Sequence, residues 1–183
     1  MQGFAHAPRY ARGLVLLEVL VAVGVLGVLA ALAAPSFAAI SERLKVRTAV
    51  QALTSSLYAA RAEAFKRGGH VTLARSASRP DCDAGTDGSQ WRCGWELFTD
   101  QDEDGTRDAA DDLLQVTQPP PGIEVIQTGR RAALKLNAWG QFNGLGALGF
   151  VLRSRADANA VSVICLSSGG RLQSWSGMDR CPG

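Results

Sequence analysis

A net charge of +2 over 183 residues gives no reason to expect nucleic acid or an acidic membrane surface as a partner, because such binding needs a strong field of one sign. The length fits one domain, or one domain with an appendage. The charges are unevenly distributed. Apart from Glu18, residues 14–34 contain only Leu, Val, Ala and Gly, whereas charged residues are scattered through everything after Ser41. That remainder is long enough to bury a modest core.

The apolar segment at 14–34 has three interpretations. A secretory signal peptide has an apolar core of about 7–15 residues, shorter than this segment, although Ala33-Ala34-Pro35 is similar to a cleavage site. A simple transmembrane anchor needs about 20 apolar residues, and the segment has that length. Neither interpretation explains Glu18. A carboxylate in a membrane helix costs about 2–3 kcal/mol and is expected to have a function and a partner.

The third interpretation accounts for this carboxylate. Arg9, Arg12 and Gly13 come directly before the apolar run, and Glu18 is the fifth residue after Gly13. This arrangement resembles the signal of type IV prepilins, in which a short basic leader ending in Gly precedes an apolar helix with Glu at its fifth position. The resemblance implies that a prepilin peptidase cleaves the chain after Gly13.

The same resemblance implies that the peptidase methylates the new amino group of Leu14, and that the helix bends at Pro35. The first mature residues here are Leu14 and Val15, where prepilins usually have Phe and Thr. In a filament, the natural partner of Glu18 is the positive N-terminus of the neighbouring subunit. Desolvation cancels much of the attraction in such a buried pair, so its main use is to set register.

The basic leader also predicts an orientation. Arg9 and Arg12 before the apolar run keep the leader cytoplasmic and direct the rest of the chain outward. We therefore expect a single-pass protein of the bacterial inner membrane with its head in the periplasm. The expected partners are the inner membrane, the prepilin peptidase and other pilin or pseudopilin subunits.

A helical pattern continues beyond the apolar segment. Apolar residues recur at three- and four-residue spacing at Ile40, Leu44, Val50, Leu53, Leu57, Ala60 and Ala64. We predict one helix from Leu14 to about Arg67, ended by Gly68-Gly69. The expected organisation is a leader at 1–13, the transmembrane and assembly half of the helix at 14–37, its amphipathic half at 38–68, and a β-rich head at 69–183.

After Gly69 the pattern changes to short apolar runs separated by turn residues. Strands are predicted at 71–74, 95–99, 113–117, 123–126, 133–136, 150–153, 161–166 and 171–175. One long helix followed by many strands indicates an α+β fold, with the helix laid across an antiparallel sheet.

All four cysteines lie in the head, at Cys82, Cys93, Cys165 and Cys181. None forms a CxxC pair, so a zinc site is not expected. An even number of cysteines downstream of a membrane segment indicates two disulfides in an oxidising compartment. Three connectivities exist. We favour the two short-range pairs, each of which closes a loop worth about 3 kcal/mol in the chain-entropy model.

Two segments, one at the end of the helix and one in the head, resemble a particular group of pilin-like proteins. Residues 57–68, which include Arg61 and Glu63, resemble the end of the long helix in the GspH/FimT group, and residues 91–100 resemble that group's W..GW..F.D segment. The group contains minor pseudopilins of type II secretion and minor pilins of type IV pili. The resemblance implies a structural subunit of one of these two filaments.

The acidic stretch after residue 99 has two interpretations. Asp100, Asp102 and Asp104 at positions one, three and five, with Gly105 at position six, have the spacing of an EF-hand calcium loop, and Asp111 stands where a bidentate Glu is usual. No flanking helix is predicted. The favoured interpretation is therefore a solvated hairpin turn without any cofactor, with a weak calcium site as the alternative.

DNA binding is an alternative function. The resemblance to FimT-like minor pilins raises it, since these are associated with DNA capture in natural transformation through a Gly-Arg-x-Arg pattern. Gly170-Arg171 supplies only half of that pattern, and Arg130 and Arg131 are further candidates to contact phosphates. The sequence favours ordinary solubilising charge.

Enzymatic activity finds no support in the sequence. No nucleophile, base and orienting group form a set, and His70 is the only histidine after Gly13. The aromatic residues of the head fall in or beside predicted strands, which indicates core positions. They are Trp91, Trp95, Phe98, Trp139, Phe142, Phe150 and Trp175.

Overall fold

The structure is a computed structural model that describes residues 12–143, 148–167 and 170–182, with the side chains at 12–15 and 32–35 left out of the description. The chain divides into two compact units, Met1–Ile40 and Ser41–Gly183. Helix α1 (Arg12–Arg67) runs through the boundary between them.

The end of α1 confirms the predicted stop. Gly68 and Gly69 adopt φ values of 77° and 102°, a region that glycine enters without steric cost. The amide of Gly69 donates to the Ala64 carbonyl at 2.8 Å. This is the long bond of a Schellman cap, and it satisfies a carbonyl that the helix leaves without an internal donor.

Among the described residues, eight strands follow the helix, at each of the predicted places. They are β1 (Val71–Arg75), β2 (Trp95–Thr99), β3 (Leu113–Thr117), β4 (Ile123–Gln127), β5 (Ala133–Leu136), β6 (Leu148–Ser154), β7 (Val161–Leu166) and β8 (Leu172–Ser176). Every strand pairing is antiparallel.

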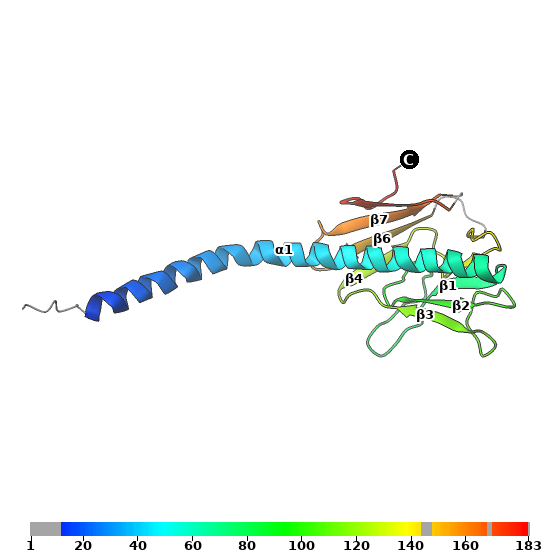
Figure 1. Ribbon diagram of the computed structural model, residues 1–183, viewed down its shortest axis with the longest axis horizontal. Helices are drawn as coiled ribbons and strands as arrows, with labels where there is room; N and C mark the ends of the chain where they lie inside the picture. The colour runs from blue at the N-terminus through cyan, green and yellow to red at the C-terminus, as the bar shows by residue number, and fades with distance from the viewer. Residues whose placement is uncertain (1–11, 144–147, 168–169, 183) are drawn as a thin grey trace, which may run out of the picture. The chain divides into compact units, whose positions relative to one another are not determined.

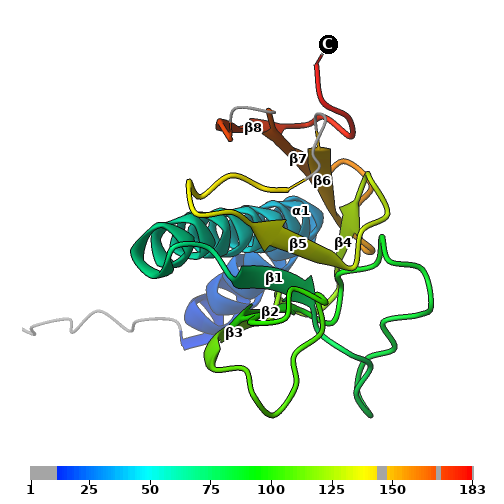
Figure 2. The same ribbon diagram turned by 90° about the vertical axis from the view of Figure 1, so that its right-hand side faces the viewer.

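The strands form two sheets, where a single sheet was expected. One has the order β3-β2-β1-β5 and the other the order β4-β6-β7-β8. Figure 2 shows the second half of α1 with β1 to β3 on one side and β6 to β8 on the other. The chain crosses between the sheets after β3, returns to pair β5 with β1, and then completes the second sheet. The α+β class is confirmed.

The head core lies where the helix meets both sheets (Figure 1). Residues Val46, Ala49, Leu53, Leu57, Ala60 and Ala64 of α1 join the same buried cluster as Leu73 and Leu97 of the first sheet and Phe150, Leu152 and Ile164 of the second. The small alanines on this face allow close approach of the sheets. The predicted stripe was wrong at its beginning. Ile40 and Leu44 are about half exposed, and Val46 and Ala49 take their place.

Trp91 joins the two layers of the head. Its backbone amide donates to the Val125 carbonyl of β4 at 2.8 Å, its indole donates to the Arg131 carbonyl at 2.9 Å, and its ring packs edge-on against Phe150. The core prediction is confirmed for Trp91, Trp95, Phe98, Phe142 and Phe150. It was wrong for Trp139, which is 77 % exposed in the turn after β5, and Trp175 is half-buried on the edge strand β8.

Candidate assembly and binding surfaces

Between Leu16 and Ala31, the helix of the first unit is apolar on every side except at Glu18. Ten Leu and Val side chains between Leu16 and Leu29 are each more than half exposed. A helix with no polar face is stable only when lipid or other protein covers it. Glu18 is also exposed, and it makes no hydrogen bond or ion pair with any residue that the structure describes.

Within the described part of the chain, no single helix satisfies the length and hydropathy expected of a membrane span, whereas Leu16–Ala31 and Ser36–Arg67 satisfy them together as a bent pair. Gly13 and Leu14 lie in the backbone of α1, as does Pro35. Their side chains and the leader at 1–11 fall outside the described residues. Cleavage, methylation and the bend at Pro35 therefore remain predictions.

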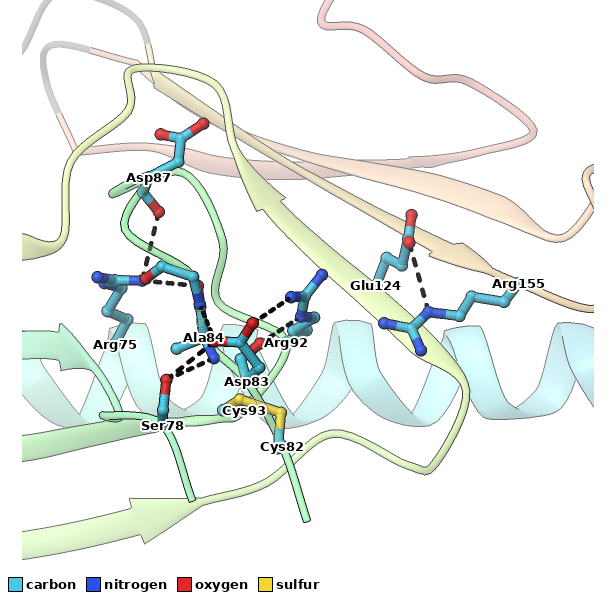
Figure 3. Close-up of polar contacts among 11 residues, drawn as sticks. Arg75, Ser78, Cys82, Asp83, Ala84, Asp87, Arg92, Cys93, Glu124 and Arg155 are labelled. Carbon is cyan, nitrogen blue, oxygen red and sulfur yellow. Dashed lines mark hydrogen bonds and ion pairs between the residues drawn. A yellow bond between two sulfur atoms is a disulfide. The ribbon is translucent and has the colours of Figure 1, made fainter. Parts of the chain in front are cut away.

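Both disulfides join the short-range pairs, Cys82–Cys93 and Cys165–Cys181. The first closes a long connection between β1 and β2, which we call the disulfide loop (residues 76–94; Figure 3). The second ties the segment after β8 back to β7. Each disulfide holds a segment that the sheet ladders alone would leave loose.

Arg75, at the end of β1, organises the disulfide loop from within. Its guanidinium donates to the carbonyls of Ala84 at 2.8 Å, Gly85 at 2.9 Å and Asp87 at 3.3 Å (Figure 3). A guanidinium has several donors in a fixed planar array, and one group thus satisfies carbonyls that no strand pairs. No sequence pattern predicts this role, because a single Arg at a strand end belongs to no motif.

A salt-bridge cluster marks one end of the second sheet. Glu124 of β4 accepts from Arg153 at 2.8 Å and from Arg155 at 3.4 Å (Figure 3 draws the Arg155 contact). The hydrogen bond from Arg153 is the main reason why the pKa of the Glu124 carboxyl lies below its ordinary range, and the charges of both arginines lower it further.

The three arginines proposed for DNA contact lie in loops at the opposite end of the same sheet. Gln127 at the end of β4 pairs with Phe150, and Leu166 at the end of β7 pairs with Leu172 at the start of β8. Arg130 and Arg131 follow β4, and Arg171 precedes β8. The two groups leave the sheet from its opposite edge strands, because β6 and β7 lie between β4 and β8.

Their charges are not equally available. Arg130 forms an ion pair with Asp87 at 3.4 Å, and Arg131 donates to the Asn143 carbonyl at 3.3 Å. Arg171 is exposed and forms no ion pair with a described carboxylate. Of the three, Arg171 is the best placed to meet a phosphate.

The acidic loop at 100–111 connects β2 to β3. One carboxylate oxygen each from Asp100, Asp102 and Asp104 lies within 4.8 Å of the other two. The Asp111 carboxylate accepts hydrogen bonds from the backbone amides of Gln101 and Asp108. The predicted solvated turn was wrong at its first residue, because Asp100 is fully buried.

His70 has a local structural role. It adopts a positive φ of 53° directly after the helix cap, and its ring lies 3.3 Å from the Glu103 carboxylate.

A long helix whose C-terminal half packs on an antiparallel β head defines an α+β protein of the pilin type. Comparison with known protein families identifies the family of this chain. Residues 49–170 match the family model described as type II transport protein GspH, and the chain belongs to that family. Two crystal structures of the type IV minor pilin FimU from Pseudomonas aeruginosa share the fold, each with a TM-score of 0.56.

The FimU chains are 17 % and 16 % identical to this chain, cover 72 % and 75 % of it, and are themselves covered to 93 %. At that identity the likeness shows the fold alone. No curated protein matches the chain.

Proposed function

We infer that this chain is a minor pilin or pseudopilin, a structural subunit built into a type IV pilus or a type II secretion pseudopilus. The observation that carries the inference is the contrast within α1. Its residues from Val46 onward bury one face in the head core, while the side chains between Leu16 and Leu29 are exposed on all sides. Membership of the GspH family supports the same conclusion.

In such a protein, the exposed half of the helix needs an apolar environment both before and after assembly. Before assembly, the hydrocarbon of the inner membrane covers it, and in the filament neighbouring helices do so. Arg9 and Arg12 keep the leader in the cytoplasm, so the head lies in the periplasm, where disulfides persist. Prepilin peptidase removes the leader after Gly13 and methylates Leu14.

Glu18 carries the assembly step in this proposal. Its carboxylate is exposed among apolar side chains, a costly position in hydrocarbon unless an opposite charge approaches. The positive amino group of a neighbouring subunit's Leu14 supplies that charge. Because the pair forms in only one relative position, it fixes the register of one subunit against the next.

The test compares incorporation of two variants into sheared filaments from cells that assemble the machine. Glu18→Leu should insert in the membrane and be cleaved normally, yet be lost from filaments by tenfold or more. Val19→Leu, which changes an apolar neighbour, is the matched control and should be incorporated normally. Normal incorporation of Glu18→Leu would contradict the proposed assembly role.

The neighbouring genes should distinguish a type II secretion pseudopilus from a type IV pilus. Genes for a secretion ATPase and a major pseudopilin beside this one would indicate type II secretion, whereas other minor pilin genes would indicate a pilus. The exposed surface of the head, including the disulfide loop, is then available to other minor subunits or to cargo. We expect no catalysis from it.

DNA binding in natural transformation is the second candidate, favoured by the emergence of Arg130, Arg131 and Arg171 at one end of the second sheet. The test is a mobility shift of duplex DNA by the detergent-solubilised full chain. Binding should weaken with salt and in Arg171→Ala, but not in Arg153→Ala, whose charge lies at the other end of the sheet. No shift at low salt would exclude this function.

A further inference from the structure

The acidic loop holds a buried carboxylate that its protein partners satisfy on one oxygen only. Oδ2 of Asp100 accepts the Thr72 hydroxyl at 2.6 Å and the Gly105 amide at 3.0 Å. Oδ1 is equally buried and has no hydrogen-bond partner among the described residues. Burying an anionic oxygen without a donor or a cation is costly, so such an oxygen calls for an explanation.

Two further carboxylates face the same point. Asp102 and Asp104 each bring an oxygen within 4.8 Å of the other and of Asp100. In each, Oδ1 accepts an amide two residues ahead in the chain, from Asp104 at 3.3 Å and from Thr106 at 2.6 Å. Among the described residues, the hydrogen bonds of these two side chains use only Oδ1, which leaves their Oδ2 atoms available for a ligand.

The backbone of the loop is shaped for a turn around that point. Gly105 has φ +85°, which is the sharp turn required at position six of an EF-hand loop. Its amide donates back to Asp100, so positions one and six of the loop are held together. The carbonyl of position seven belongs to Thr106.

The basic side chains nearby are engaged with other groups. Lys135 donates to the Glu103 carbonyl, His70 faces the Glu103 carboxylate, and Arg107 pairs with Glu96 at 2.9 Å. None of these three side chains forms an ion pair with the clustered aspartates. Three carboxylates that repel one another, with one oxygen buried and unpaired, match the demand of a divalent cation.

We propose that this loop binds calcium between β2 and β3. Asp100, Asp102 and Asp104 provide side-chain oxygens, the Thr106 carbonyl provides position seven, and Asp111 stands at position twelve. Calcium takes six to eight oxygen ligands in flexible geometry, whereas magnesium demands a stricter octahedron. Because Asp111 replaces the usual bidentate Glu, the affinity should fall in the weak extracellular range, with Kd of about 10⁻⁴–10⁻³ M.

A cation bound at this site would stabilise the head, not the N-terminal half of α1. The loop begins directly after β2 and ends beside β3, and the Asp100 amide donates to the His70 carbonyl at 2.9 Å. A bound cation would therefore fix the β2–β3 connection against the segment that leaves the helix. The proposal does not depend on which filament the protein joins.

The test uses the detergent-solubilised full chain, stripped with a chelator and titrated with calcium chloride or magnesium chloride in a calorimeter. Calcium at 10-fold above its Kd should also raise the Tm of the head, because a ligand that binds only the folded state stabilises it. Asp104→Asn keeps a side-chain oxygen at position five but removes one negative charge from the ligand set, and it should raise Kd about tenfold or more, since affinity follows the charge of the ligand set.

The matched control is Glu103→Gln. It removes one negative charge from the same loop at position four, which supplies no side-chain ligand, and should change Kd by less than about threefold. Asp102→Asn is a second ligand variant, and the Tm of each variant without calcium reports whether it folds. Absence of calcium binding, equal binding of magnesium, or equal losses in Asp104→Asn and Glu103→Gln would each overturn the proposal.

Discussion

The indole of Trp95 on β2 donates to the Ser56 hydroxyl of α1 at 2.9 Å, and both side chains are buried completely. The same hydroxyl donates to the Ala52 carbonyl at 3.1 Å and accepts from the Gln115 amide at 3.2 Å. Ser56 is thus the polar point at which the apolar face of the helix meets the first sheet.

Replacing this serine should destabilise the head. In Ser56→Ala the Trp95 indole keeps its burial and loses its acceptor, which costs about 1–3 kcal/mol. Thr48→Ala is the control, because Thr48 also donates to the carbonyl four residues earlier but is exposed. Urea unfolding of both variants in detergent measures the difference. Equal stability of Ser56→Ala and Thr48→Ala would show that the buried hydrogen bond contributes nothing.

Gly94 is required both for its positive φ and because there is no space for a side chain. A comparison with Gly122 distinguishes these two effects. The φ of Gly94 is +102°, and a side chain there would collide with the Thr117 carbonyl of β3. Gly122 has φ +81° but open space around it. Gly122→Ala should therefore cost about 1 kcal/mol from backbone strain alone, and Gly94→Ala should cost at least about 2 kcal/mol more from overpacking. Similar losses in thermal or urea unfolding would contradict the steric argument.

The free energy of unfolding of the head should decrease at acidic pH, partly because of Glu124. Its pKa is lowered in the folded state, chiefly by the hydrogen bond from Arg153. Its contribution is complete above about pH 5 and is lost as the pH falls through the folded pKa. The loss should be below about 1 kcal/mol, because both arginines are largely exposed.

The measurement is urea unfolding between pH 7 and pH 3. Glu124→Gln should unfold more easily than the native chain at pH 7, and the difference should vanish toward pH 3. Asp81→Asn, at an exposed carboxylate in a different ion pair, controls for the loss of one charge. A difference that grows on acidification would have the wrong sign for a lowered pKa.

Local patterns predicted the elements of this fold because each has a local cause. The glycines after Arg67 end the helix by their positive φ, and short apolar runs between turns became the eight strands. The short cysteine spacings predicted both disulfides. These features depend on residues near one another in the chain.

The errors lie where distant parts of the chain meet. Nothing local specifies that β5 pairs with β1 rather than with β4, so the division into two sheets was not foreseen. Burial of Asp100 depends on the Thr72 hydroxyl contributed by β1, and the acidic stretch by itself suggests only a solvated turn. Trp139 was assigned to the core on residue type, yet its turn holds it outward and 77 % exposed.

The most direct test of the filament-subunit account is mass spectrometry of the mature N-terminus, on protein purified from cells that contain a prepilin peptidase. The account predicts a chain that begins at Leu14 with a methylated amino group, and an uncleaved chain when the peptidase is deleted. An intact leader beginning at Met1 in peptidase-containing cells, or cleavage after Ala34, would contradict it.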